Sequence, residues 1–187
     1  GCFGVGYPLP DRATLVSSRG VVSNALPPES DLWLAALQAA VAAAQDVVGR
    51  TAPNPPVGAA WVERDAVGNP HVLAVGVHRR AGEAHAERNV FEALRAALAP
   101  IDLETGWLVV TLEPCRHHGR QPPCVEAIIE LGIRNVAYAF ADPNPDARGG
   151  AEWLREQGVR VVELSTIDRA TPSWISALTQ AQRQLAP

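Results

Sequence analysis

The chain has 187 residues, a length that fits one domain and allows it to bury a core. Its 47% hydrophobic and 19% charged residues are typical of a globular protein, and no apolar run reaches the ~18 residues of a membrane span. The net charge of −4 argues against a broad nucleic-acid surface, although a local basic pocket remains possible. Three cysteines give no disulfide framework, and the chain shows no signal peptide. We therefore expect a cytoplasmic protein without nucleic-acid or membrane partners.

The chain divides into two parts at about residue 30. Residues 1–29 are rich in Gly, Pro and Ser, without a sustained hydrophobic period, and we expect an N-terminal arm. This arm is either poorly ordered on the surface or packed on a partner subunit. Residues 30–187 are expected to form one domain. Its first helix should begin after Ser30 as the N-cap, carry apolar residues at helical spacing, and stop at Gly49.

The rest of the chain alternates between strands and helices. In chain order we expect strands at 57–62 and 72–77, a helix from about 85, a strand at 107–112, a helix at 122–132, a strand at 135–140, a helix at 152–158, a strand at 159–164 and a helix from 171. The first two strands should pair as an antiparallel hairpin. The alternation that follows predicts parallel strands. The fold class is therefore α/β, a three-layer α/β/α domain with a mixed five-stranded sheet.

Potential metal ligands occur in the order His85-Ala-Glu87, Pro114-Cys115 and Cys124. Zinc deaminases have this order, in which a His and two Cys hold Zn²⁺ and a Glu that is not a ligand moves protons. Two cysteines with eight residues between them would by themselves be weak evidence, because lone cysteines are usually small buried hydrophobes. A structural zinc site would normally show four ligands with paired spacing. We predict one Zn²⁺ per chain on His85, Cys115 and Cys124, with Glu87 as the catalytic residue.

The expected fold brings these residues together. His85 and Glu87 would lie at the start of one helix, Cys124 in the first turn of the next, and Cys115 after the carboxyl end of a central strand. Ligands of open α/β sheets bind beyond the carboxyl ends of their strands, and helix N-termini favour thiolates. Ligand order and fold geometry therefore indicate the same place.

The chemistry of deamination explains why the predicted site has these residue types. Zinc with three protein ligands keeps a fourth position for water, whose pKa it lowers to roughly 7. A neighbouring carboxylate can take the proton of that water, pass it to a ring nitrogen and then protonate the departing amine. This indicates a zinc-dependent aminohydrolase acting on a cyclic amidine and releasing ammonia.

Several segments between residues 30 and 165 resemble the deaminase domain of the bifunctional riboflavin-biosynthesis pyrimidine deaminase/reductase, of the cytidine deaminase-like superfamily. They are Pro53-Asn-Pro-Pro-Val-Gly58, Gly76-Val-His78, Ala81-Gly-Glu-Ala-His-Ala-Glu87, Thr111-Leu-Glu-Pro-Cys115, His117-His-Gly-Arg120, Pro122-Pro-Cys124 and Asp142-Pro-Asn-Pro145. The eight-residue gap between the cysteines separates this branch from deaminases with Pro-Cys-x-x-Cys. The resemblance implies deamination of diaminohydroxyphosphoribosylaminopyrimidine, a small phosphorylated substrate, within 30–187.

The same resemblance implies a set of substrate-binding residues and a pathway partner. The residues are Asn54, His78, His117, Arg120, Asp142 and Asn144. An arginine offers a fork of donors for phosphate, and Asn and Asp can bind a pyrimidine edge. Taken without the family, each asparagine could equally be a turn residue, and Arg120 could be a surface charge. A separate reductase is the implied partner, and small size with apolar helices favours a homodimer.

The chain departs from the family pattern at three places. Arg116 stands where the family usually has Ser, Gln121 where it has Thr, and the loop at 146–150 is one residue short. Two alternatives therefore stay open. One is a deaminase of the same fold that acts on a nucleoside, nucleobase or natural-product precursor. The other is a catalytically idle zinc-binding scaffold, which would not need Glu87.

Overall fold

A computed structural model describes residues 26–97, 100–119, 121–167 and 172–185. The arm expected at 1–29 lies almost entirely outside the described residues. So does Arg120, one of the proposed substrate ligands. Five helices, a 3-10 turn and a five-stranded sheet make up the regular structure of the described residues.

The sheet has the order β2-β1-β3-β4-β5. Its strands are β1 (Gly58–Arg64), β2 (Pro70–Val77), β3 (Trp107–Leu112), β4 (Asn135–Phe140) and β5 (Arg160–Glu163). The β1 strand pairs antiparallel with both β2 and β3, whereas β3, β4 and β5 are parallel. The six residues of β3 are all buried, as expected of a central strand that is covered on both faces. The mixed five-stranded sheet predicted from the sequence is confirmed.

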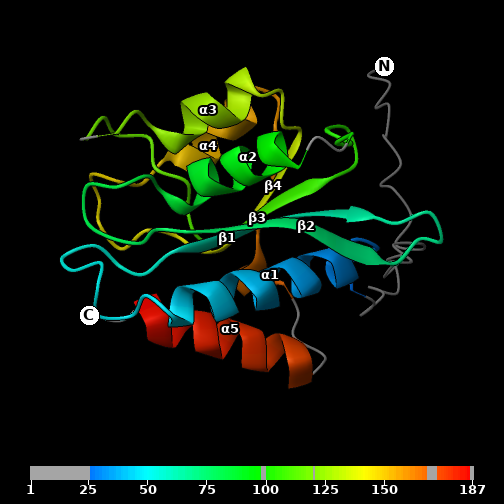
Figure 1. The fold of residues 1–187 in the computed structure, drawn as a ribbon, viewed down its shortest axis with the longest axis horizontal. Helices are drawn as coiled ribbons and strands as arrows, with labels where there is room; N and C mark the ends of the chain where they lie inside the picture. Colours follow the sequence, from blue (N-terminus) through cyan, green and yellow to red (C-terminus); the bar gives the residue numbers. More distant parts are fainter. Residues whose placement is uncertain (1–25, 98–99, 120, 168–171, 186–187) are drawn as a thin grey trace, which may run out of the picture.

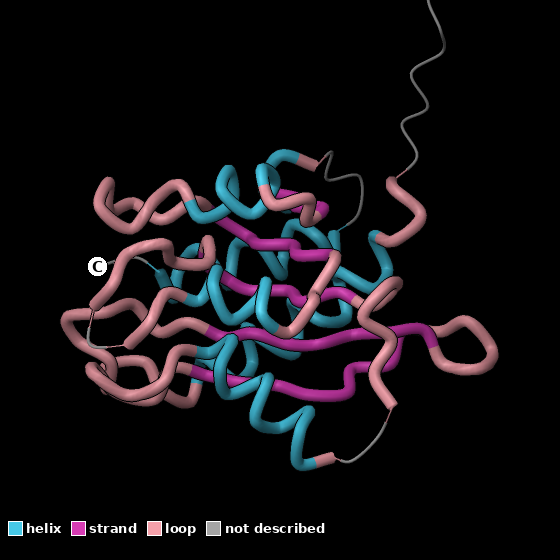
Figure 2. Tube along the Cα trace, turned by 90° about the horizontal axis from the view of Figure 1, so that it is seen from above, coloured by secondary structure: helices cyan, strands magenta, loops and turns pink. Residues whose placement is uncertain are grey.

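Helices cover both faces of the sheet and form three layers (Figure 1). They are α1 (Ser30–Gln45), α2 (Ala86–Ala96), α3 (Cys124–Glu130), α4 (Gly150–Glu156) and α5 (Pro172–Leu185), with the 3-10 turn η1 (Leu164–Thr166) after β5. In Figure 1, α1 and α5 lie below the sheet, and α2, α3 and α4 lie above it. The view from above in Figure 2 shows the strands running side by side between these helices.

Each face of the sheet has its own apolar core. The core under α1 and α5 contains Trp33, Trp107 and Trp174 among its buried residues. The core under α2, α3 and α4 contains Trp61, Phe91 and Ile128. The side chains of each strand alternate between the two cores, because successive residues of a strand point to opposite faces. This explains why β3 and β4 are near-continuous apolar runs in the sequence.

Helix starts differ from the predicted ones by one or two residues. Ser30 is the first residue of α1 rather than its N-cap, and Glu29 in the N-cap position makes no side-chain capping bond. The α3 helix begins at Cys124, with Pro123 preceding it, and not at Pro122. Gly49 has a positive φ of 81°, but α1 already ends at Gln45 and turns follow it. The starts shift by one or two residues and the end of α1 by more, because the backbone at a helix end is fixed by packing as well as by local sequence.

Two glycines allow helices to lie directly on the hairpin. A Cβ on Gly58 would lie 2.0 Å from the Ala40 carbonyl oxygen of α1. A Cβ on Gly76 would lie 2.2 Å from the Ala86 carbonyl oxygen at the start of α2. The second contact fixes the height of α2 above β2, next to the predicted metal ligand His85.

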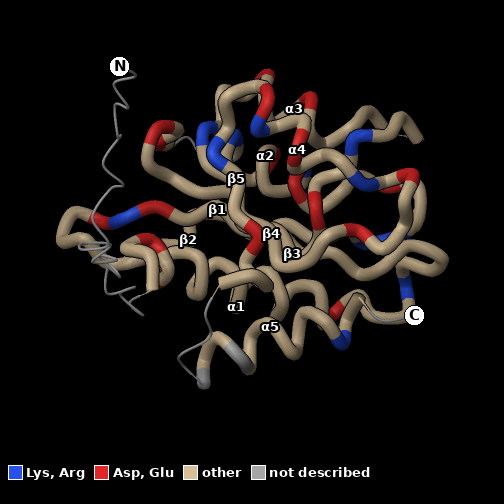
Figure 3. The backbone as a smooth tube through the Cα atoms, turned by 180° about the vertical axis from the view of Figure 1, so that it is seen from behind, with Lys and Arg blue, Asp and Glu red and all other residues tan. Residues whose placement is uncertain are grey.

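Charges are spread over the molecule. Figure 3 shows basic and acidic positions interspersed along the chain rather than separated into regions of one sign. Within the described residues, every helix is too short or too polar to cross a membrane.

Candidate metal centre and cavity

Three elements bring the predicted metal ligands together. His85 is the N-cap residue of α2, Cys115 follows the end of β3, and Cys124 is the first residue of α3. The Val125 amide donates to the Cys115 carbonyl (3.3 Å), and the Cys124 amide points to the Cys115 sulfur (3.5 Å). The start of α3 is therefore attached directly to the turn that carries Cys115.

The distances within this group fit one zinc ion. The ligand atoms of His85, Cys115 and Cys124 all lie within 4.8 Å of one another. The His85 Nδ1 atom is 3.5 Å from the Cys115 sulfur and 3.3 Å from the Cys124 sulfur. A tetrahedral zinc ion with bonds of about 2.0–2.3 Å separates nitrogen and sulfur ligands by about 3.5 Å. With three ligands in place, such an ion would keep one corner for a non-protein ligand.

The two sulfurs interact with each other and with the imidazole. A hydrogen bond between the Cys115 and Cys124 sulfurs, with a further contribution from His85, lowers the pKa of Cys115. The same bond raises the pKa of Cys124, and burial adds to this effect. The hydrogen bond to Cys115 raises the pKa of His85. The group therefore favours a thiolate at Cys115, the form in which cysteine binds zinc.

Glu87 is buried beside this group without belonging to it. Glu87 lies in the first turn of α2 and is only 4% exposed. Burial is the main cause that raises the pKa of Glu87; the charge on Cys115 raises it further, and His85 and Cys124 act in the opposite direction. Catalytic carboxylates that must exchange protons near neutral pH have environments of this kind.

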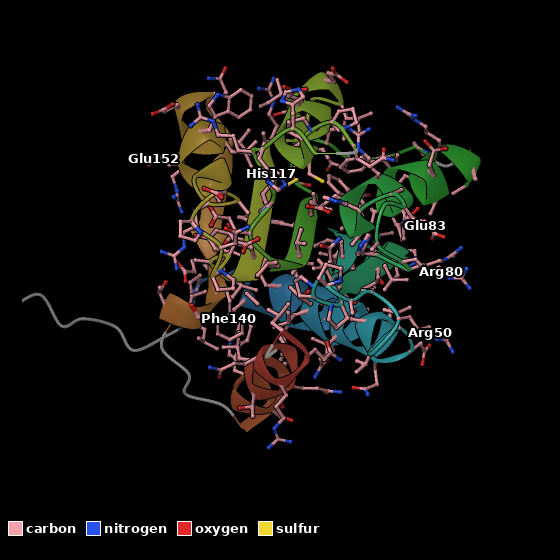
Figure 4. All side chains as sticks on the ribbon, turned by 90° about the vertical axis from the view of Figure 1, so that its left-hand side faces the viewer. Arg50, Arg80, Glu83, His117, Phe140 and Glu152 are labelled. Atoms are coloured by element: carbon pink, nitrogen blue, oxygen red, sulfur yellow. The ribbon has the colours of Figure 1, made fainter. Side chains whose placement is uncertain are left out.

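A cavity of about 280 Å³ opens next to His85. Two loops line it together with Pro53 and Asn54. The loop before α2 contributes Ala81, Gly82, Glu83 and His85, and the loop between the two cysteines contributes His117, Gly119 and Gln121. In Figure 4 the labelled His117 lies near the sulfur atoms, and Glu83 lies on the segment that leads to α2. The Gln121 side chain donates to the Gly82 carbonyl (3.5 Å) and so joins the two loops.

A comparison of the sequence with protein families shows the family of the chain. A model of the family "cytidine and deoxycytidylate deaminase zinc-binding region" matches residues 33–140, more than half of the chain and all three candidate ligands. The chain belongs to this deaminase family. The zinc cofactor predicted from the sequence is thereby confirmed for a site that the geometry fits.

Curated relatives of this deaminase place it on the riboflavin branch of the family. The riboflavin biosynthesis protein RibD of Corynebacterium ammoniagenes is 39% identical over 147 residues, 79% of this chain and 41% of the relative. A diaminohydroxyphosphoribosylamino-pyrimidine deaminase of Buchnera aphidicola is 42% identical over 112 residues, 59% of this chain and 69% of the relative. The chain thus spans less than half the length of the RibD relative. The resemblance stated from the motifs is confirmed.

Solved structures agree with this placement. The crystal structure of a diaminohydroxyphosphoribosylaminopyrimidine deaminase/5-amino-6-(5-phosphoribosylamino)uracil reductase from Thermotoga maritima has a TM-score of 0.62 and 39% identity, covering 71% of this chain and 36% of that one. RibD of Acinetobacter baumannii has a TM-score of 0.63 and 29% identity, covering 83% and 38%. The cytidine deaminase-like fold is therefore shown.

Of the five proposed substrate residues of this deaminase that the structure describes, Asn54 and His117 line the cavity. A third, His78, is buried behind it, where its Nε2 atom lies 3.3 Å from the Asn54 amide nitrogen. The other ring nitrogen of His78 lies 3.2 Å from the Ala84 carbonyl oxygen, and the His78 and His85 rings meet edge to face at 5.4 Å. His78 thus lies between Asn54 and the candidate ligand His85.

Asp142 and Asn144 lie on a separate loop that follows β4. The Asn144 amide donates to Asp142 Oδ1 (2.8 Å), and the Asp146 amide donates to Asn144 Oδ1 (3.1 Å). Burial is the main cause that raises the pKa of Asp142, with Glu113 and Cys115 adding to it and His117 opposing it. Neither Asp142 nor Asn144 lines the cavity.

The structure also contains polar residues for which no individual role was predicted. Glu113 is buried and accepts backbone amide hydrogens from two distant segments. Asn89 on α2 donates to the Val77 carbonyl (2.8 Å) and, at 3.4 Å, to the Ala84 carbonyl. Glu113 lies within Thr111-Leu-Glu-Pro-Cys115, one of the segments that resemble the deaminase family, and this membership could have marked it as a functional residue. The only sequence signal for Asn89 is that it is a polar residue on the inward-facing side of its helix.

Proposed function

We propose that this chain catalyses the hydrolytic deamination of diaminohydroxyphosphoribosylaminopyrimidine in riboflavin biosynthesis. The observation that carries the proposal is the group of His85, Cys115 and Cys124 beside a buried Glu87 that is not one of the ligands. Relatives at about 40% identity bear the names of this pathway and of this deaminase. A purely structural zinc site would have no use for a buried carboxylate at this place.

The roles of the chain's own groups follow from their positions. Zinc, when held by His85, Cys115 and Cys124, would lower the pKa of a water molecule and make it a nucleophile at neutral pH. Glu87 accepts one proton of the attacking water and delivers it to the ring nitrogen. It then takes the second proton of that water and passes it to the amino group that leaves. The ring carbon exchanges its amino group for oxygen, and ammonia is released. Burial of Glu87 suits it to both accept and return a proton.

The cavity between the two loops would hold the substrate. Asn54 and His117 face this space, and His78 supports Asn54 from behind. We assign Asp142 and Asn144 to contacts with the polar edge of the substrate, and Arg120 to its phosphate. A phosphate would gain a bidentate partner in the arginine.

The wider context of the reaction is part of the same proposal. We assign residues 30–187 to the zinc-dependent deaminase domain and propose a homodimer. A reductase is its expected pathway partner, in keeping with the paired deaminase and reductase named for the Thermotoga maritima structure.

A substrate panel tests the proposal. Zinc-loaded protein is incubated with the phosphorylated ribosylaminopyrimidine, its dephosphorylated form, cytidine and guanine, and ammonia release is measured. We expect turnover of the phosphorylated compound and a clear loss without the phosphate. Turnover of cytidine or guanine alone would instead identify a deaminase of the same fold with another substrate. Absence of turnover on all four, with zinc saturated, would contradict the catalytic assignment and favour a binding domain.

A further inference from the structure

We infer that Glu113 is a positioning residue that holds the loop carrying Asp142 and Asn144 against the metal-binding turn. Glu113 lies two residues before Cys115, at the end of β3, and is 7% exposed. The inference deepens the proposed function and rests on it, because it concerns how the same site keeps its substrate-binding loop in place.

The Glu113 carboxylate is held by backbone amides. Its Oε1 atom accepts from the Gly149 amide (3.1 Å) and from the Ala151 amide (3.0 Å). Its Oε2 atom accepts from the Asp142 amide (3.3 Å). Among the described residues no ion pair involves Glu113. A buried carboxylate is costly unless it is hydrogen-bonded, so these amides and the carboxylate require one another.

The two oxygens of Glu113 serve two different segments. Oε1 holds the start of α4, whereas Oε2 holds the first residue of the proposed substrate loop. Two further hydrogen bonds continue along the loop from Asp142. The Asp142 carboxylate accepts from the Asn144 amide, and the Asn144 side chain accepts from the Asp146 amide. The bond to Oε2 therefore anchors the end from which the rest of the loop is arranged.

A second contact ties the same segments together. A Cβ added to Gly150 would lie 1.9 Å from the Pro114 carbonyl oxygen, so α4 rests directly on the residue between Glu113 and Cys115. The Glu113 amide also donates to the Phe140 carbonyl (2.9 Å), which continues the pairing of β3 and β4 to the beginning of the loop. The metal-binding turn and the loop therefore form one connected unit, with the Glu113 side chain at its centre.

The variant Glu113→Gln separates these contacts. A glutamine can turn its oxygen toward the amides of Gly149 and Ala151, but its NH₂ group then faces the Asp142 amide, donor against donor. We expect zinc content and kcat close to those of the wild-type enzyme and a KM for the phosphorylated pyrimidine that rises about tenfold or more. A general loss of folding would instead lower the active fraction and leave KM unchanged.

The matched control is Glu152→Gln, which removes the same charge from an exposed position on α4, labelled in Figure 4. Its KM should equal that of the wild-type chain. Amide hydrogen exchange provides a readout that needs no substrate. In zinc-loaded Glu113→Gln, exchange should rise at residues 142–149 and stay unchanged in α1.

The outcomes separate this inference from the proposed function. If the wild-type chain shows no turnover of the pyrimidine, the proposed function fails, and hydrogen exchange alone decides whether Glu113 anchors the loop. If the wild-type chain is active and Glu113→Gln keeps its KM, the positioning role is overturned. If Glu113→Gln does not fold, Glu113→Asp replaces it. The aspartate keeps the negative charge but moves it about 1.5 Å away from the amides, and KM and hydrogen exchange are measured as before.

Discussion

Glu87 and His85 are two residues apart, yet their surroundings give them different tasks. His85 ends the loop before α2 and faces both sulfurs, whereas Glu87 points into a buried environment beside them. His85 has the extended backbone of an N-cap residue (φ −69°, ψ 163°), so its side chain does not follow the helical spacing, which would turn residues two apart to different sides. One His-Ala-Glu segment thereby supplies a candidate ligand and a candidate proton carrier.

The variant Glu87→Gln tests this division. The amide keeps the size of the side chain but cannot carry the proton, so zinc binding should persist while ammonia release falls by roughly 10²–10⁴. Metal analysis of the purified variant and a steady-state ammonia assay measure the two effects. Turnover at the wild-type rate with zinc bound would refute the proton-carrier role of Glu87.

At the scale of the elements, the height of α2 above the β1–β2 hairpin controls the metal centre. Gly76 lets the Ala86 carbonyl and the Val90 amide of α2 approach the strand closely. Asn89 closes the same contact from the helix side by bonding to the Val77 and Ala84 carbonyls. The start of α2, and His85 with it, is therefore set by backbone contact and hydrogen bonds together.

Gly76→Ala should push α2 away from β2. The added Cβ would lie 2.2 Å from the Ala86 carbonyl oxygen and 2.6 Å from the Val90 nitrogen, neither of which can give way by a side-chain rotation. We expect a loss of about 1–3 kcal/mol in the free energy of unfolding, measured by urea denaturation. Gly119→Ala is the control, because its Cβ would meet nothing closer than 3.7 Å. Equal stability of the two variants would show that the close approach is unimportant.

Zinc should join three elements into one unit. The candidate ligands lie before α2, after β3 and at the start of α3, so an ion bound only by the folded chain adds to its stability. Free zinc at 100 times its dissociation constant would contribute about 2.7 kcal/mol. Chelation should therefore lower the Tm of the wild-type chain. The variant His85→Ala should show a much smaller shift, and an identical shift in both proteins would place the metal elsewhere.

At the scale of the whole molecule, one ion pair connects residues that are far apart in the sequence. Glu29, just before α1, bonds to Arg160 on the edge strand β5 at 2.6 Å, across 131 residues of sequence. The guanidinium of Arg160 also lies over the Trp107 ring, 5.0 Å from its centre. The hydrogen bond from Arg160 is the main cause that lowers the pKa of Glu29 below 4.5.

This pair predicts an acid-dependent contribution to stability. Because the pKa of Glu29 is lower in the folded than in the unfolded chain, its stabilisation is complete above about pH 4.5 and disappears as the pH falls through the folded value. The pair is partly exposed, so we expect roughly 0.2–1 kcal/mol near pH 7. Unfolding of wild-type and Glu29→Gln chains across this range measures it. A difference that persists undiminished in acid would contradict the pair as its source.

The sequence by itself determined the layered α/β fold, the order of its elements and the set of candidate zinc ligands. These follow from local signals, namely hydrophobic periodicity, turn residues and a spaced ligand motif, that do not depend on distant parts of the chain. Helix starts at Ser30 and Cys124 were displaced by a residue or two, because packing shares in fixing helix ends.

Only the tertiary structure decided which polar residues meet. It placed His78 behind Asn54, brought Asn89 to the loop before His85, and surrounded Glu113 with amides from residues 142, 149 and 151. These partners lie up to 38 residues apart in sequence, and no local pattern encodes a hydrogen bond of that range. They depend on how the sheet stacks strand ends beside one another, which is a property of the complete fold.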